Sequence, residues 1–417
     1  MKIVRPSSTT MTMLAAAAWT TTLASAKPIC SALTPYSLTN AAQQYPELAP
    51  AVAAMQDIAV ASWYTDRWTN QISDLLAKCH DAIPSIVIYG LPDKDCGDGG
   101  FSQGGDNKNT NDYHVWLTKL TAQVGTREVI YVLEPDAVGL IAGGGCGVQK
   151  GYMANLKMAV KMLSENSQAH IYVDVASWAD QAGAIQVVNE LKGAGNLKGV
   201  AINTSNYRGT SELNALCQTY SSATGGLHCV FDVSRNFNGS PQNEWCNAKS
   251  AGIGALTTAE TGNPLVDYHL WIKVPGESDG ECTGRGPDAA VGPPAGSFFY
   301  DGFKSMWNQG YYVKEKGLPE IGGSWPAPSS NAPPTPTSSD DDQYPTSAAP
   351  PSPPSDGQVE IYGQCGGNNY NGPTACQDDL HCQVWNEWYH QCIPEEEYSR
   401  VKKAVVCPRM LPSRPLR

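Results

Sequence analysis

Short apolar segments recur along this sequence, and each of them runs directly into polar residues. Stretches with apolar residues at helical spacing lie between several of these segments, as in residues 152–166. Strands that alternate with helices indicate a mostly parallel sheet or barrel covered by helices, so we predict an α/β fold. The strands are expected within residues 83–90, 128–136, 170–175, 199–206, 228–235 and 268–273.

The polar residues that follow these segments are mainly carboxylates. In barrels of parallel strands, the carboxyl ends of the strands form the active-site face. A single aspartate at such a place is equally well explained as a helix N-cap or a solvated turn residue. Several carboxylates at one rim, without metal ligands, instead favour acetal hydrolysis, which needs a proton donor and an opposing base or nucleophile. The residues expected at this rim are Asp95, Asp136, Asp174, Asp232 and the pair Lys273 and Glu277.

Three other motifs suggest different chemistries, but each lacks a required residue. Residues 91–100 resemble a calcium loop without its sixth-position glycine and final glutamate. Residues 276–280 match the G-x-S-x-G pattern of serine esterases, but the next histidine is the distant His381. Residues 143–147 are rich in glycine but do not complete the dinucleotide fingerprint. We therefore expect neither a metal nor a cofactor.

The N-terminal residues have the features of a secretory signal peptide. Lys2 and Arg5 precede an apolar stretch at residues 11–23, and an A-x-A cleavage pattern follows at residues 24–26. We predict that residues 1–26 are removed and that the protein is secreted and extracellular. Thirteen cysteines fit this compartment, and Cys407 is the expected unpaired thiol of the odd count. The net charge of −12 argues against nucleic acid or an anionic membrane as a partner.

A linker is predicted at residues 324–358, which are rich in proline, serine and threonine. Such a tract cannot bury a core, and we expect it to be extended and O-glycosylated. It would separate a large body, residues 27–323, from a small module, residues 359–394. The basic segment at residues 395–417 has no predicted function.

The small module combines four cysteines with an excess of aromatic residues. A unit of this size needs disulfides to fold, and its core is too small to bury every large ring. Exposed rings in such a module indicate a binding face, and flat rings stack well on sugars. A stapled domain without a ligand is the alternative. The rings concerned are Tyr362, Tyr370, Trp388 and Tyr389.

Residues 362–394 resemble the fungal family 1 carbohydrate-binding module, a cellulose binder. The likeness rests on Y-G-Q-C-G-G, G-P-T, C-Q-V and the aromatic pair that precedes Q-C. It implies that Tyr362, Trp388 and Tyr389 form a flat cellulose-binding face, assisted by Asn386 and Gln391. It also implies the disulfides Cys365–Cys382 and Cys376–Cys392.

The body resembles glycoside hydrolase family 6 over roughly residues 58–312. The motifs that carry this resemblance include YGLPDKDC, YVLEPDAV, YVDVASW, FDVSRN and WIKVPGESDGEC. The resemblance implies a distorted TIM-like barrel and an inverting β-1,4-glucanase. Asp136 would be the general acid, with Asp95 keeping its pKa high and relaying a proton from water. Asp279 would be the candidate base, and Asp174 a further carboxylate near the reacting sugar.

The same resemblance implies a set of substrate contacts and two disulfides. The contacts are Trp63, Tyr89, Ser102, Trp245, Lys273 and Glu277, and the disulfides are Cys96–Cys146 and Cys246–Cys282. For the four unmatched cysteines of the body, we expect the pairs Cys30–Cys79 and Cys217–Cys229.

Two departures from the family pattern affect the prediction. Ser177 stands where family members often carry a histidine, which keeps open a cellulose-binding protein with impaired catalysis. The segment 277–298 looks shorter than the loop that roofs the tunnel of cellobiohydrolases, which favours a more open cleft and internal cutting. We therefore predict a monomeric, secreted cellulase that cuts internally with inversion. A cellobiohydrolase, or an enzyme for mixed-linkage glucan or xylan, is the alternative.

Overall fold

The computed structural model describes the body almost completely and the C-terminal module in part. The described residues are 27–31, 35–67, 70–97, 100–325, 358–359, 364–366, 373–386 and 389–395. Within the described body, all strands belong to a single parallel sheet in which they follow one another in chain order. They are β1 (Ser62–Thr65), β2 (Ser85–Tyr89), β3 (Val129–Leu133), β4 (Ala169–Asp174), β5 (Leu197–Ile202), β6 (His228–Asp232) and β7 (Val266–Leu270).

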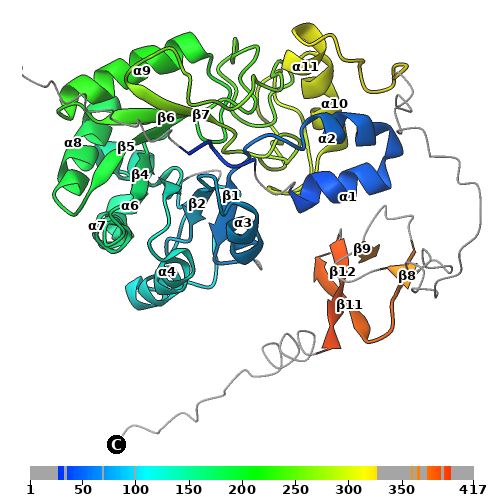
Figure 1. Cartoon of the computed structure of the whole chain (residues 1–417), viewed down its shortest axis with the longest axis horizontal. Helices are drawn as coiled ribbons and strands as arrows, with labels where there is room; N and C mark the ends of the chain where they lie inside the picture. The colour runs from blue at the N-terminus through cyan, green and yellow to red at the C-terminus, as the bar shows by residue number, and fades with distance from the viewer. Residues whose placement is uncertain are drawn as a thin grey trace, which may run out of the picture.

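The sheet curls until its two edges meet, as the ribbon in Figure 1 indicates. Val60, just before β1, forms a parallel bridge with Trp271, just after β7. The Ala61 N–H donates to the Trp271 carbonyl at 2.8 Å, and the Trp63 indole donates to the Ile272 carbonyl at 2.8 Å. The result is a distorted barrel, as predicted; it has seven strands, and the bridge and the Trp63 hydrogen bond join its two edges.

Strand β1 is absent from the strands expected from sequence. Of its residues only Tyr64 is buried, and the other three are partly buried. An edge strand of this kind lacks the continuous apolar run that marks β2 and β3, whose residues are all buried. The other six strands fall within the predicted segments or begin one or two residues before them.

Alternate strand residues face two separate apolar layers, because successive side chains point to opposite sides of a sheet. Val87, Ile130, Val132 and Val230 fill the inside of the barrel. Their neighbours in the strands pack outward against helices. This arrangement brings the carboxyl ends of the strands together at one mouth of the barrel.

The helices cover the outside of the sheet, with α3, α4, α7, α8 and α9 around it in Figure 1. The predicted helix at residues 152–166 is α7. The α-helices are α1 (Tyr36–Gln44), α2 (Ala49–Ala54), α3 (Ile72–Lys78), α4 (Thr110–Val124), α5 (Ala137–Ile141), α6 (Cys146–Gln149), α7 (Tyr152–Leu163), α8 (Gln181–Lys192), α9 (Thr210–Ala223), α10 (Tyr300–Asn308) and α11 (Tyr311–Lys314). The 3₁₀ helices are η1 (Pro46–Leu48) and η2 (Ala142–Gly144).

Disulfides staple the body at four places, in the pairings expected from sequence. Two of them tie the loops at the mouth of the barrel and two tie more distant parts of the body. They are Cys30–Cys79, Cys96–Cys146, Cys217–Cys229 and Cys246–Cys282.

The described part of the C-terminal module consists of short strands and two disulfides. The disulfides are Cys365–Cys382 and Cys376–Cys392, the pairings that the resemblance implied. The strands are β8 (Gln358–Val359), β9 (Gln364–Gly366), β10 (Ala375–Cys376), β11 (Leu380–Asn386) and β12 (Tyr389–Pro394).

The predicted cellulose-binding face lies largely outside the described residues. Tyr362 and Trp388 are not described, nor are the side chains of Asn386, Tyr389 and Gln391, whose backbones belong to β11 and β12. The face therefore stays a prediction. Among the described helices, none combines the length and the apolar character needed to cross a membrane.

Candidate active site

Strand β3 ends in two carboxylates that have different surroundings. Glu134 is fully buried, and it accepts hydrogen bonds from the Gly90 N–H at 3.0 Å and the Tyr113 hydroxyl at 2.8 Å. It therefore ties the end of β3 to the end of β2 and to helix α4. Asp136 is only partly buried and immediately precedes α5, yet its side chain makes no capping hydrogen bond. The plain explanation of Asp136 as an N-cap thus fails.

The backbone at Asp136 is held in an uncommon conformation. Glu134 and Asp136 have φ values of 47° and 69°, in the left-handed region that few non-glycine residues adopt. The Asp136 N–H donates to Asp174 Oδ1 at 3.0 Å, and the Ala176 N–H donates to the same oxygen at 2.9 Å. Asp174, at the end of β4, thereby fixes the turn that presents the Asp136 side chain. Strain of this kind is typical of functional sites.

The surroundings of Asp136 favour its protonated form. Burial, the largest cause, and the carboxylates of Asp174 and Asp95 together raise the pKa of Asp136 to about 7. Burial also raises the pKa of Asp174, to about 6. Sequence reasoning assigned the raised pKa to neighbouring carboxylates; here burial is the larger cause. A carboxyl group with a pKa near 7 can donate a proton at neutral pH.

Asp95 follows β2 and faces the same mouth of the barrel. The Ser102 N–H donates to Asp95 Oδ2 at 2.7 Å, and burial raises the pKa of Asp95. Tyr89 lies beside both acids. Burial is the main cause that raises the pKa of its phenol, and the nearby carboxylates of Asp95 and Asp136 add to this effect. Its ring meets that of Trp63 edge to face, with centroids 5.5 Å apart. The structure thus brings together five residues that were predicted from sequence, namely Trp63, Tyr89, Asp95, Ser102 and Asp136.

A buried ion pair that sequence reasoning missed holds the loop carrying Asp95 and Ser102. Lys94 and Asp66 are 2% and 1% exposed and are in direct contact. Lys94 also donates to the Gly104 carbonyl at 2.7 Å, and Asp66 accepts from the Asn107 N–H at 2.8 Å. The pair therefore ties the two ends of this loop together. No local pattern signals it, because its members lie 28 residues apart.

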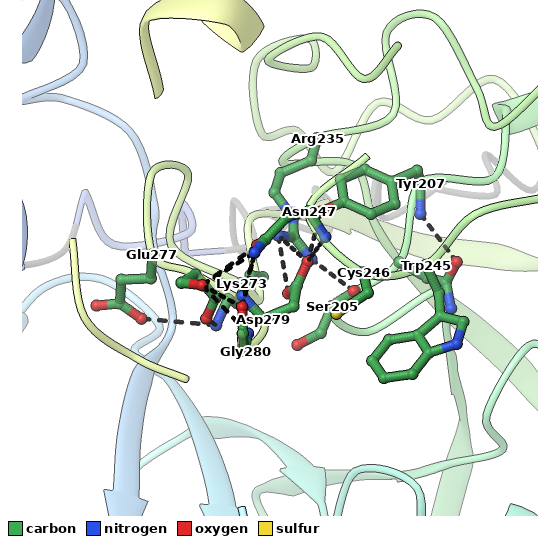
Figure 2. A network of polar contacts seen from close by, with 12 residues as sticks. Ser205, Tyr207, Arg235, Trp245, Cys246, Asn247, Lys273, Glu277, Asp279 and Gly280 are labelled. Carbon is green, nitrogen blue, oxygen red and sulfur yellow. Dashed lines mark hydrogen bonds and ion pairs between the residues drawn. The ribbon is translucent and has the colours of Figure 1, made fainter. Parts of the chain in front are cut away.

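Asp279 lies at the centre of a polar network, which Figure 2 shows. Its carboxylate accepts from the Tyr207 hydroxyl at 2.5 Å, and from Arg235 and the Asn247 N–H at 3.0 Å each. Arg235 is 1% exposed, and its guanidinium also lies over the Tyr207 ring, 4.3 Å from the centroid. A buried guanidinium and two further donors thus hold the Asp279 carboxylate in place. Tyr207, Arg235 and Asn247 were not predicted.

Asp232 has a structural role rather than a chemical one. It is 1% exposed, and its oxygens accept from backbone N–H groups of Ser205, Ser234, Ile272 and Lys273 at 3.0–3.2 Å. It therefore holds together the loops that follow β5, β6 and β7. Of the strand-end carboxylates expected at the rim, this one fits the plain turn explanation.

Lys273 and Glu277 lie on the opposite side of Asp279 from Trp245 in Figure 2. The Lys273 ammonium is 3.8 Å from Glu277 Oε2, and Glu277 also accepts from the Ser37 hydroxyl at 2.7 Å. Burial raises the pKa of Glu277. Ser37 belongs to α1, distant in sequence, and was not predicted.

Trp245 forms an exposed aromatic wall at the rim. It is 36% exposed and stacks under the Arg285 guanidinium, 4.3 Å from its ring. Phe101, 39% exposed, lies near it, with centroids 6.2 Å apart. A side-chain carbon added to Gly280 would lie 2.4 Å from the Phe101 ring. Phe101 therefore brings the loop after β2 against the loop after β7.

Ser177 and Trp178 occupy the loop that follows β4. The Ser177 hydroxyl oxygen is buried and makes no hydrogen bond within the described part of the chain. Trp178 is 46% exposed, and its indole nitrogen donates to Asp136 Oδ1 at 3.0 Å. Sequence reasoning noted Ser177 as a departure from the family pattern and did not foresee the contact of Trp178 with Asp136.

Comparison with known proteins places this arrangement in a family. The sequence model of glycosyl hydrolases family 6 matches residues 24–309. The chain belongs to glycosyl hydrolases family 6. The model of the fungal cellulose binding domain matches residues 361–389.

Curated relatives in this family include enzymes named for internal and for terminal attack. Endoglucanase A of Thermobispora bispora is 35% identical over 207 residues, which are 48% of this chain and 44% of that protein. The probable exoglucanase GH6D of Podospora anserina is 30% identical over 350 residues, which are 75% of this chain and 76% of that protein. The matched region spans less than half the length of the endoglucanases A of T. bispora and Cellulomonas fimi.

Solved structures of the family share the fold. The endoglucanase Cel6 of Mycobacterium tuberculosis, solved with methyl-cellobiosyl-4-deoxy-4-thio-β-D-cellobioside, is 26% identical with a TM-score of 0.59. The match covers 68% of this chain and 97% of that one. Cellobiohydrolase II of Humicola insolens is 20% identical with a TM-score of 0.59, and the match covers 67% of this chain and 96% of that one. At this identity the match shows a likeness in fold.

Proposed function

We propose that this protein is a secreted cellulase that hydrolyses β-1,4-glucosidic bonds with inversion of the anomeric configuration. The observation that carries the proposal is the state of Asp136. Burial, with neighbouring carboxylates, raises its pKa to about 7 at the mouth of the barrel, where a proton donor is needed. Family membership and the cellulose binding domain match support the choice of cellulose as substrate.

In the proposed mechanism, Asp136 donates its proton to the glycosidic oxygen as the bond to the anomeric carbon breaks. A water molecule attacks that carbon from the opposite face of the sugar, and its proton passes to a base. Asp279 is the candidate base, and its carboxylate is held in place by Arg235 and Tyr207. Asp95, held by the Ser102 N–H, is proposed to relay a proton from the water.

The remaining predicted residues would bind the glucan chain. Trp63, Tyr89 and Trp245 offer aromatic surface at the mouth of the barrel, and Lys273 and Glu277 offer charged hydrogen-bonding groups. Tyr362, Trp388, Tyr389, Asn386 and Gln391 are proposed to form the cellulose-binding face of the C-terminal module. We further propose the predicted signal peptide, linker and module boundaries, and a monomer that needs no cofactor.

Internal attack is our preferred mode of action. Glu277 and Phe298 pair in an antiparallel bridge, and the Ser278 N–H donates to the Ser297 carbonyl at 2.8 Å. The segment between them is therefore folded back on itself, which supports an open cleft. Terminal attack is the second candidate, because the contact of Phe101 with Gly280 joins two loops at the rim. Viscosity loss compared with reducing-end release on a soluble cellulose derivative distinguishes the two modes.

Asp136→Asn tests the proposed function. This variant keeps the shape of the side chain but cannot supply the proton, so hydrolysis of amorphous cellulose should fall by at least about a hundredfold. Binding to cellulose should persist. Asp180→Asn is the matched control, since Asp180 caps α8 through the Gly183 N–H at 2.7 Å and an asparagine can keep this bond. Near-normal hydrolysis by Asp136→Asn, or product that retains the original anomeric configuration, would contradict the proposal.

A further inference from the structure

The contact between Trp178 and Asp136 gives the two carboxyl oxygens of the acid different surroundings. The Trp178 indole nitrogen donates to Asp136 Oδ1 at 3.0 Å. An indole N–H is a donor only, and in a protonated carboxyl group the carbonyl oxygen accepts a hydrogen bond more strongly than the hydroxyl oxygen, so the indole favours Oδ1 as the carbonyl oxygen. When Asp136 is protonated, its hydrogen therefore resides on Oδ2. The orientation of the indole thus selects the oxygen from which a proton can leave.

The indole is held in this orientation by the helix that begins next to the acid. A side-chain carbon added to Gly139, in α5, would lie 2.8 Å from the Trp178 ring and 2.7 Å from the Ala176 side chain. The ring thus packs directly on the helix backbone. Ala176 has a φ of 48°, and its carbonyl accepts from the Ala179 N–H at 2.8 Å, so a tight turn returns Trp178 to the acid.

The charged groups around Asp136 shift its pKa in the opposite direction from Trp178. The carboxylates of Asp174, Asp95 and Asp279 all raise the pKa of Asp136, whereas the hydrogen bond from Trp178 lowers it. Asp174 ends β4, whereas Asp95 and Asp279 lie in the loops after β2 and β7. The Tyr89 phenol also faces the acid, in its neutral form.

We propose that Trp178 is a positioning residue for the proton donor of this enzyme. Its N–H holds Oδ1 as the acceptor and aims the protonated Oδ2 at the bond to be cleaved. This inference rests on the proposed role of Asp136 as the general acid. It adds a residue that orients the acid without itself exchanging a proton.

Trp178→Phe tests the inference, since phenylalanine keeps a flat ring and removes the donor. On a soluble cellulose derivative, kcat should fall about tenfold with little change in KM, because the acid loses its orientation but the substrate keeps its contacts. Losing a donor that favours the carboxylate should also raise the pKa of Asp136. The alkaline limb of the kcat/KM profile should therefore move up by about one pH unit.

A second substrate distinguishes positioning of the acid from a general structural effect. Dinitrophenyl β-cellobioside releases a leaving group that needs no protonation, so Trp178→Phe should hydrolyse it within about twofold of the normal rate. Gly139→Ala, which displaces the indole but keeps it, should reproduce the shift of the alkaline limb. Trp245→Phe, a change at another exposed indole of the rim, should leave that limb in place.

The outcomes separate this inference from the proposed function. An unmoved alkaline limb in Trp178→Phe, with equal losses on both substrates and an unchanged melting temperature, overturns the positioning role while Asp136→Asn stays inactive. Hydrolysis that survives Asp136→Asn overturns the proposed function itself. The inference is supported if the alkaline limb moves in both Trp178→Phe and Gly139→Ala and if activity is lost on the cellulose derivative but not on dinitrophenyl β-cellobioside.

Discussion

Replacing Asp174 by asparagine isolates the effect of one neighbouring charge on the proposed acid. Asp174 Oδ1 accepts from the N–H groups of Asp136 and Ala176, and the carbonyl oxygen of an asparagine can accept both bonds. The turn that presents Asp136 should therefore persist. What the variant removes is a buried negative charge that disfavours ionisation of Asp136.

The size of this effect follows from the separation of the two carboxyl groups. The Asp136 amide nitrogen is 3.0 Å from Asp174 Oδ1, which puts the two groups roughly 6 Å apart. At an effective dielectric constant of about 20, unit charges at that distance repel by about 3 kcal/mol. This corresponds to about two pH units at about 1.4 kcal/mol per unit. Because the pKa of Asp174 is itself raised to about 6, it is largely ionised at pH 7 and most of this effect should appear.

The sign of the change is determined by the role of the acid. Asp136 must be protonated to act, so activity is lost as the pH rises through its pKa. Without the charge of Asp174 this pKa falls, and the alkaline limb should move down by one to two pH units. The assay is kcat/KM on a soluble cellulose derivative from pH 4 to 9, with Asp180→Asn as the control. An alkaline limb that stays in place or moves up would refute the reasoning.

The remaining predictions concern stability and are measured by urea denaturation. Lys94→Met should lower the free energy of unfolding by about 3–5 kcal/mol, because it leaves the charge of Asp66 buried without its partner. Adding Asp66→Asn should recover most of this loss. A Lys94→Met variant of unchanged stability would contradict the prediction. Tyr113→Phe should cost about 1–3 kcal/mol by removing the hydroxyl that donates to buried Glu134 at 2.8 Å. An unchanged midpoint would mean that the backbone N–H groups of Gly90 and Leu91 are enough to satisfy Glu134.

Strand-end aspartates illustrate how far sequence patterns reach. Asp136 and Asp232 both follow buried β-branched runs, and the local pattern treats them alike. In the structure, backbone N–H groups from three loops occupy the oxygens of Asp232, whereas Asp136 accepts one indole N–H and faces other carboxylates. The difference comes from neighbours brought together by the barrel, which no local pattern encodes.

The amino-acid sequence by itself determined the alternation of strands and helices, the rim carboxylates and the cysteines that pair, because periodicity, composition and family motifs are local properties of the chain. Tertiary structure alone decided the protonation and geometry of the site. The Lys94–Asp66 pair, the contact of Arg235 with Asp279 and that of Trp178 with Asp136 join residues 28, 44 and 42 positions apart. Burial and charge depend on such contacts, since the free energy of a carboxylate is determined by the groups that surround it in space.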